Sequence, residues 1–136
     1  MNEIANEVII GKCEIDNHAD TTCLGVNFVP LFYTQQECTV APFSQTYQPI
    51  ERVPIVTGAT AYDDAQTGQV FLLIFHQSLF FGDQLDHSLI NPNQCRSYGI
   101  KVTDNPWDLD PIGLTCKDLD FHIPFQYSHN VISFKT

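Results

Sequence analysis

The sequence is poor in basic residues. Six Lys and Arg stand against sixteen Asp and Glu, which gives a formal net charge of −10. A protein that binds nucleic acid needs basic side chains to displace the counterions of the phosphates. We therefore expect no nucleic-acid partner, and integrase, nucleocapsid and polymerase domains are disfavoured. An acidic surface is compatible with an enzyme that works with carboxylates.

Long apolar runs and paired cysteines are also missing. No run reaches the ~18 apolar residues of a transmembrane helix, and residues 1–4 lack the pattern of a signal peptide. We expect no membrane partner and a cytoplasmic location. The five cysteines are odd in number and form no Cys-x-x-Cys pair, which predicts reduced thiols.

What the sequence does contain indicates a packed β domain. Its 136 residues suit one domain, residues 1–136, and 43% of them are hydrophobic. Ten Phe together with many Val and Ile favour strands, whereas eight Pro and seven Gly argue against long helices. The prediction is an all-β fold with one short helix.

Three segments give the clearest local predictions. Residues 53–75 predict a hairpin with a polar tip at 63–68, whose returning strand is apolar enough to be covered on both faces. Residues 86–99 have helical character, with Asn91-Pro92 as a start and Gly99 as a stop. Two last strands are expected around 121–125 and 131–134.

The loop at residues 16–20, Asp-Asn-His-Ala-Asp, directly follows an apolar strand. A carboxylate at such a place is costly unless it is hydrogen-bonded or functional. In an aspartic protease, two carboxylates share one proton, and the ionised one activates the water that attacks the peptide. The sequence holds one loop of this kind, so a pair requires a two-fold dimer that brings Asp16 of each chain to the axis.

These residues resemble a known motif. Retroviral and retrotransposon proteases carry Asp-Thr/Ser-Gly-Ala, often followed by Asp, after an apolar strand. Asp16, Ala19 and Asp20 match this pattern, whereas Asn17 and His18 depart from it. A hairpin, an apolar-apolar-Gly strand and a short helix follow in the family's order.

The resemblance extends to one branch of the family. The stretch 86–94, Asp-His-Ser-Leu-Ile-Asn-Pro-Asn-Gln, is similar to a segment of Copia-type polyproteins from diatoms and related microbial eukaryotes. In that branch the loop reads Asp-Ser/Asn-His-Ala-Asp-Thr. On this basis the resemblance covers about residues 8–134.

The resemblance implies a retropepsin-like small β-barrel with a flap hairpin, which acts as a homodimeric aspartic endopeptidase of a retrotransposon Pol polyprotein. It implies a polyprotein peptide as substrate, a location in the cytoplasm or in element-encoded virus-like particles, and no cofactor or metal. The implied roles are catalysis by Asp16, loop support by Asn17, His18 and Ala19, and substrate binding by Asp20, Thr21, Tyr62 at the flap, Leu79, Phe80 and Phe81.

Other interpretations stay open. Asn17 and His18 favour a retropepsin fold without catalysis, acting in self-assembly or protein interaction, because the family places Thr or Ser and Gly there. Asp16 and Asp20 are also typical of a polar turn that caps its own backbone. A metal-binding β domain is a third possibility, although Cys13, His18, Asp20 and Cys23 lack the tight spacing that zinc prefers.

Overall fold

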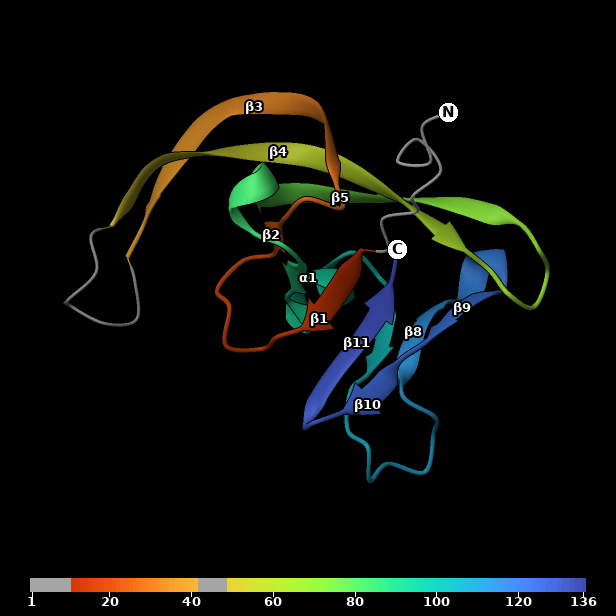
Figure 1. Ribbon diagram of the computed structural model, residues 1–136. Coiled ribbons are helices and arrows are strands. Elements are labelled where there is room, and N and C mark those ends of the chain that lie inside the picture. Colours follow the sequence, from red (N-terminus) through yellow and green to blue (C-terminus); the bar gives the residue numbers. More distant parts are fainter. Residues whose placement is uncertain (1–10, 42–48) are drawn as a thin grey trace, which may run out of the picture.

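The computed structural model describes residues 11–41 and 49–136, and strands dominate it (Figure 1). The large sheet has eight strands: β1 (Lys12–Ile15), β2 (Cys23–Leu24), β3 (Val29–Val40), β4 (Ile50–Asp63), β5 (Val70–Phe80), β6 (Ser88–Ile90), β10 (Gln126–Ser128) and β11 (Val131–Lys135). The small sheet contains β7 (Lys101–Thr103), β8 (Gly113–Cys116) and β9 (Phe121–Pro124). The helices are α1 (Pro92–Ser97) and the 3-10 turns η2 (Gly82–Gln84) and η3 (Lys117–Leu119).

The all-β prediction with one short α-helix is confirmed, but the expected barrel is not formed. The large sheet runs β10-β11-β1-β6-β2-β5-β4-β3, so β10 and β3 are its two outer strands in the described part of the chain. Closure requires each strand to pair on both sides. β2, one of the two neighbours of β5, has only two residues, and no pairing joins β10 to β3 in the described part of the chain. Figure 1 shows β3, β4 and β5 arching over the shorter strands.

The predicted hairpin is present as β4 and β5, which pair from Ile55↔Leu79 to Asp63↔Val70. Its turn is closed by Asp64, whose carboxylate accepts hydrogen bonds from the Gln66 N–H (3.1 Å) and the Thr67 hydroxyl (3.0 Å). The glycine of the turn, Gly68, has φ +74°, which few other residues adopt without strain. The turn chemistry of the sequence therefore determines this connection.

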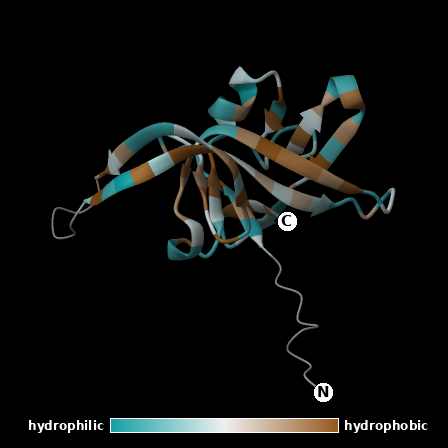
Figure 2. Ribbon diagram, turned by 90° about the horizontal axis from the view of Figure 1, so that it is seen from above, coloured by the Kyte–Doolittle hydropathy of each residue, from teal (hydrophilic) through white to brown (hydrophobic). Residues whose placement is uncertain are grey.

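Strand β5 is not covered on both faces as expected. Leu72 and Ile74 are 62% and 48% exposed, whereas their neighbours Leu73 and Phe75 are half-buried. Only the alternate residues turn to the core, as the period of two in a strand requires. Figure 2 shows hydrophobic bands along the long strands that give way to the polar β4–β5 turn.

The helical prediction for 86–99 is correct only in its second half. Residues 88–90 form β6, which pairs in parallel with β1 through Cys13↔Ser88 and Ile15↔Ile90. The helix then begins where Asn91-Pro92 predicts: the Asn91 side chain accepts hydrogen bonds from the N–H groups of Asn93 and Gln94, at 2.8 and 3.0 Å. Pairing with β1 overrides the helical pattern of Leu89 and Ile90, because tertiary contacts outweigh intrinsic propensity.

The last two predicted strands exist but belong to different sheets. β9 pairs with β8, whereas β11 lies between β1 and β10 in the large sheet. β11 is an inner strand of the large sheet, since it pairs with both β1 and β10. β10 has the outer edge at this end of the sheet.

One cluster of buried residues connects the two sheets. Phe134 of β11 stacks on Phe125 with ring centroids 5.7 Å apart, and Tyr62 of β4 meets Phe121 edge to face at 5.9 Å. Aromatic pairs of this geometry add to the free energy gained from burial. Cys13 of β1 is fully buried in the same cluster.

We predict a loss of stability at alkaline pH that originates at Cys13. Burial raises the pKa of its thiol from 9.0 to about 12. The unfolded chain therefore releases this proton near pH 9 while the folded chain retains it, so stability is intact below pH 9 and falls as the pH rises toward 12. The slope is at most about 1.4 kcal/mol per pH unit.

Urea unfolding of the wild type and Cys13→Ser, repeated at pH 7.5 and at alkaline pH values, measures this effect. The free-energy gap between the two proteins should shrink above pH 9, because serine does not ionise there. A gap that stays constant with pH would contradict the assignment.

Candidate functional site

The predicted catalytic loop leaves β1 at Asp16, whose backbone continues the β1–β6 ladder. Its N–H donates to the carbonyl oxygen of Ile90 at 2.9 Å. The half-buried Asp16 carboxylate accepts a hydrogen bond from the His18 N–H, also at 2.9 Å. Asn17 and His18 themselves are exposed. The strand thus fixes the backbone of Asp16, and the turn orients one carboxylate oxygen.

The first turn of α1 anchors the rest of this loop. The Asn91 side-chain amide donates to the carbonyl oxygen of Ala19, and the Asn91 N–H donates to the Thr22 hydroxyl at 3.1 Å. The Thr22 N–H in turn donates to the Gln94 side-chain oxygen at 2.8 Å. Asn91 and Thr22 are both buried, so these bonds are shielded from water and costly to lose.

A cavity of about 320 Å³ lies beside Asp16. Three carboxylates and no Lys or Arg line it, together with amide, imidazole and apolar groups. The lining comes from β1, the loop after it, the turn after β7 and the start of β11: Glu14, Ile15, Asp16, Asn17, His18, Asp104, Asn130, Val131 and Ile132.

Two of the three carboxylates already have cationic partners. Glu14 lies 3.2 Å from the Lys12 ammonium and 3.3 Å from His87 Nε2. Asp104 lies 3.2 Å from the Arg96 guanidinium. Among the described residues, Asp16 has no such ion pair. It is therefore the one carboxylate of this cavity that no cation neutralises among the described residues.

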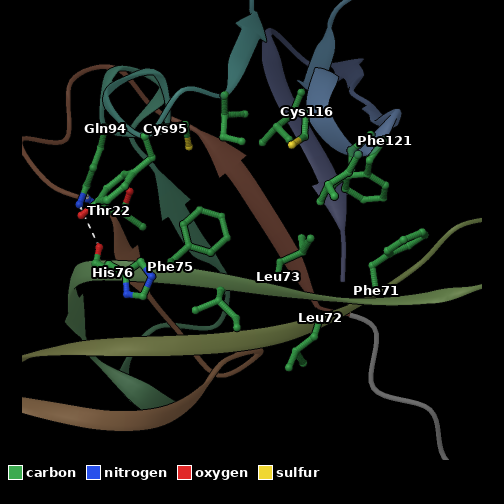
Figure 3. A pocket seen from close by; sticks show the side chains of 16 residues that line it. Thr22, Phe71, Leu72, Leu73, Phe75, His76, Gln94, Cys95, Cys116 and Phe121 are labelled. Atoms are coloured by element: carbon green, nitrogen blue, oxygen red, sulfur yellow. Dashed lines mark hydrogen bonds between the residues drawn. The ribbon is translucent and has the colours of Figure 1, made fainter.

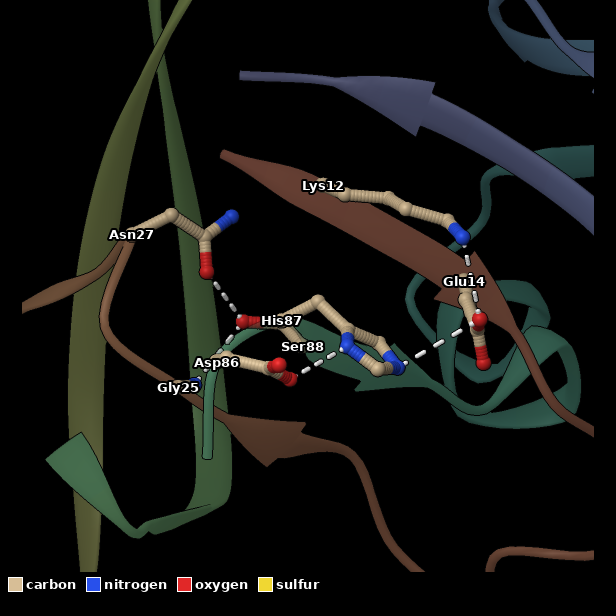
Figure 4. Close-up of polar contacts among 7 residues, drawn as sticks. All are labelled: Lys12, Glu14, Gly25, Asn27, Asp86, His87 and Ser88. Atoms are coloured by element: carbon tan, nitrogen blue, oxygen red, sulfur yellow. Dashed lines mark hydrogen bonds and ion pairs between the residues drawn. The ribbon is translucent and has the colours of Figure 1, made fainter. Parts of the chain in front are cut away.

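Polar contacts of residues 86–88, at the start of β6, join this strand to its neighbours (Figure 4). His87 connects Asp86, at 2.7 Å from Nδ1, to Glu14 of β1. On the other side, the buried Ser88 hydroxyl donates to the Asn27 side-chain oxygen at 2.6 Å and accepts from the Gly25 N–H at 2.8 Å. β6 is thereby tied to β1 and to the segment that follows β2.

The predicted substrate-binding residues lie in three places, of which the Asp16 loop and the segment 79–81 are two. Asp20 and Thr21 lie in the same loop as Asp16. The segment 79–81 lies beside β2, beyond the far end of that loop, because the Leu79 N–H donates to the carbonyl oxygen of Thr22 at 2.9 Å. Leu79 is buried, and Phe80 and Phe81 are half-buried.

Tyr62 of β4 is in the third place, in the core between the two sheets. Its ring packs against Phe121 and Phe134, at 5.9 and 6.4 Å between centroids. The 64–69 turn does not line the cavity beside Asp16, and neither does any predicted substrate-binding residue: Asp20, Thr21, Tyr62, Leu79, Phe80 and Phe81. In Figure 1 this turn lies at the end of the long strands next to β9.

Sequence reasoning missed several residues of the site. Asn91 was assigned only to the helix start, although its amide donors leave it free to bind a second segment as well. Glu14 shares a strand face with Asp16, which the period of two could have revealed. Asp104 and Asn130 enter the cavity through contacts between distant segments, for which the sequence carries no local signal.

Within residues 11–41 and 49–136, no three His, Cys, Asp or Glu side chains gather closely enough to hold a metal ion. No helix there has the length and apolar character needed to span a membrane. No family model, curated protein or solved structure matches the chain.

We predict that Asn91→Ala lowers the free energy of unfolding by about 2 kcal/mol, because it removes both the helix cap and the bond to Ala19. Asn91→Ser is the matched variant: serine keeps a capping oxygen but is too short to reach Ala19, so the expected loss is about 1 kcal/mol. Chemical denaturation measures both. Equal stability of Asn91→Ser and wild type would show that the bond to Ala19 does not hold the loop.

Proposed function

We propose that the chain is a retropepsin-like aspartic endopeptidase whose active site forms between two copies. One observation carries the proposal: Asp16 lies at the exit of a buried strand, in a loop anchored to both β6 and α1, with its carboxylate at an open cavity. A carboxylate acts as a general base only when its position is fixed relative to the water it activates. The loop provides this fixed position.

The reaction needs a second carboxylate, which this cavity does not supply within one chain. Two carboxyl groups that share a proton must lie against each other without a cation that keeps both ionised. Glu14 and Asp104 are each paired with cations. A second copy brings another Asp16 to the same axis by symmetry, and an isologous contact then builds the dyad.

In this dimer the ionised Asp16 takes a proton from a water molecule, and that water attacks the scissile carbonyl carbon. The protonated Asp16 of the other copy donates to the carbonyl oxygen as negative charge develops there.

Asp20 and Thr21 are proposed to bind the backbone of the substrate, and Leu79, Phe80 and Phe81 its apolar side chains. Asn17, His18 and Ala19 keep the proposed role of loop support.

The substrate and setting follow from the sequence resemblance. The stretch 86–94 that resembles Copia-type polyproteins contains β6 and the start of α1, the segments that hold the Asp16 loop. We therefore propose a retrotransposon Pol polyprotein as substrate, in the cytoplasm or in element-encoded virus-like particles. Tyr62 is not retained in a direct role beside Asp16, because its ring packs between β9 and β11.

A second candidate is a retropepsin-like module without catalysis that acts in self-assembly. The observation in its favour is the hydrogen bond from the His18 N–H to the Asp16 carboxylate. This bond is typical of an Asp that stabilises its own turn, which explains an Asp at this position without any reaction. The two candidates differ only in whether peptides are cleaved.

We predict that the protein cleaves members of an unstructured peptide library and that Asp16→Asn lowers the cleavage rate by roughly a thousandfold or more, because the amide cannot take the proton. Mass spectrometry of the products, across a pH series from acid to neutral, measures both. Asp83→Asn is the matched control, since Asp83 is exposed in η2 and does not line the cavity. Its rate should equal that of the wild type.

Two outcomes would refute catalysis. One is a folded wild-type dimer that cleaves nothing at any pH, which leaves the assembly module as the better account. The other is Asp16→Asn cleaving as fast as Asp83→Asn, which would assign the activity to another group.

A further inference from the structure

A second cavity, also about 320 Å³, separates β5 from the small sheet and α1 (Figure 3). Phe71, Leu73 and Phe75 point into it from β5, whereas Leu72 points away. The opposite walls include Cys95 of α1, Leu114 of β8 and Ile123 of β9. No strand pairing joins the two sheets, and side chains from both line the space between them.

The walls favour one class of ligand. No Asp, Glu, Lys or Arg lines the cavity, so nothing there would neutralise a charged molecule. Two of the polar groups at its rim already bond to protein atoms: the Gln94 amide donates to the carbonyl oxygen of Gln77 at 2.9 Å, and His76 Nδ1 lies 3.1 Å from the Thr57 hydroxyl. An occupant would therefore be held mainly by burial of its apolar surface.

The size of the cavity sets the size of that ligand. Ligand-binding pockets in proteins begin at roughly 300 Å³, and an engineered apolar cavity of about 150 Å³ stays dry and binds benzene. A space of about 320 Å³ is roughly twice that. We infer that the cavity between β5 and the small sheet binds a neutral, apolar small molecule about the size of two fused aromatic rings.

This site is distinct from the cavity at Asp16. The residues that line the two cavities do not overlap, and β1 contributes only to the cavity at Asp16. The proposal therefore does not depend on peptide cleavage. The lining of this cavity contains two free thiols, those of Cys95 and Cys116, and the half-buried Cys116 can be labelled to detect an occupant.

The test uses 6-propionyl-2-(dimethylamino)naphthalene, a neutral dye built on two fused aromatic rings whose emission shifts to shorter wavelength in apolar surroundings. Titration into the intact chain should give saturable binding at one site per chain. Leu73→Trp fills the space from β5 and should weaken binding about tenfold or more. Val70→Trp adds the same bulk on the exposed face of β5, outside the lining, and should bind like the wild type.

Thiol labelling locates the probe without any substitution. Iodoacetamide, followed by peptide mass mapping, should modify Cys116 more slowly when the probe is bound. Cys38 is exposed and outside the lining, so its labelling rate should not change. This measurement keeps the proposal testable even where Leu73→Trp fails to fold.

Three results would overturn the inference. One is no saturable binding by the wild type, and another is equal protection of Cys116 and Cys38. The third is protection of Cys116 that rises with protein concentration and needs no probe, which would make a second copy of the chain the occupant.

Discussion

The hydrogen bonds of Asn91 hold together the parts on which the proposed site depends. Its side-chain oxygen caps α1, its side-chain amide holds Ala19, and its backbone N–H donates to Thr22. One buried residue therefore joins the end of β6, the start of the helix and the loop after β1. Because β1 and β6 are adjacent parallel strands, the Asp16 carboxylate emerges where both strands end.

The carboxylates around Asp16 differ in whether a cation neutralises them. Glu14 and Asp104 approach Asp16 in one cavity, but Lys12, His87 and Arg96 balance them. The chain has only six Lys and Arg for sixteen Asp and Glu, and two of the six, Lys12 and Arg96, form ion pairs at this cavity. Asp16 stays without a cation among the described residues, which is the state that a proton-sharing pair of carboxylates requires.

The sequence predicted the local features of the fold well and its long-range pairings poorly. Asp64, Gly68 and the Asn91-Pro92 step act within a few residues of themselves, so the hairpin turn and the helix start could be read directly. β6 was expected as helix because Leu89 and Ile90 suit both patterns, and only the distant β1 decides between them. The open sheet and the strands β7 and β8 depend on contacts that no local pattern reports.

The candidate site divides in the same way. Asp16 and its loop were identified from one contiguous motif, whereas the cavity beside Asp16 combines three separate segments of the chain. Native mass spectrometry with pepstatin, an inhibitor that mimics the transition state of aspartic proteases, tests the central claim most directly. Two chains that build one site predict a single pepstatin per dimer, and no pepstatin on Asp16→Asn. One pepstatin per monomer, or none on a wild-type dimer, would contradict the account.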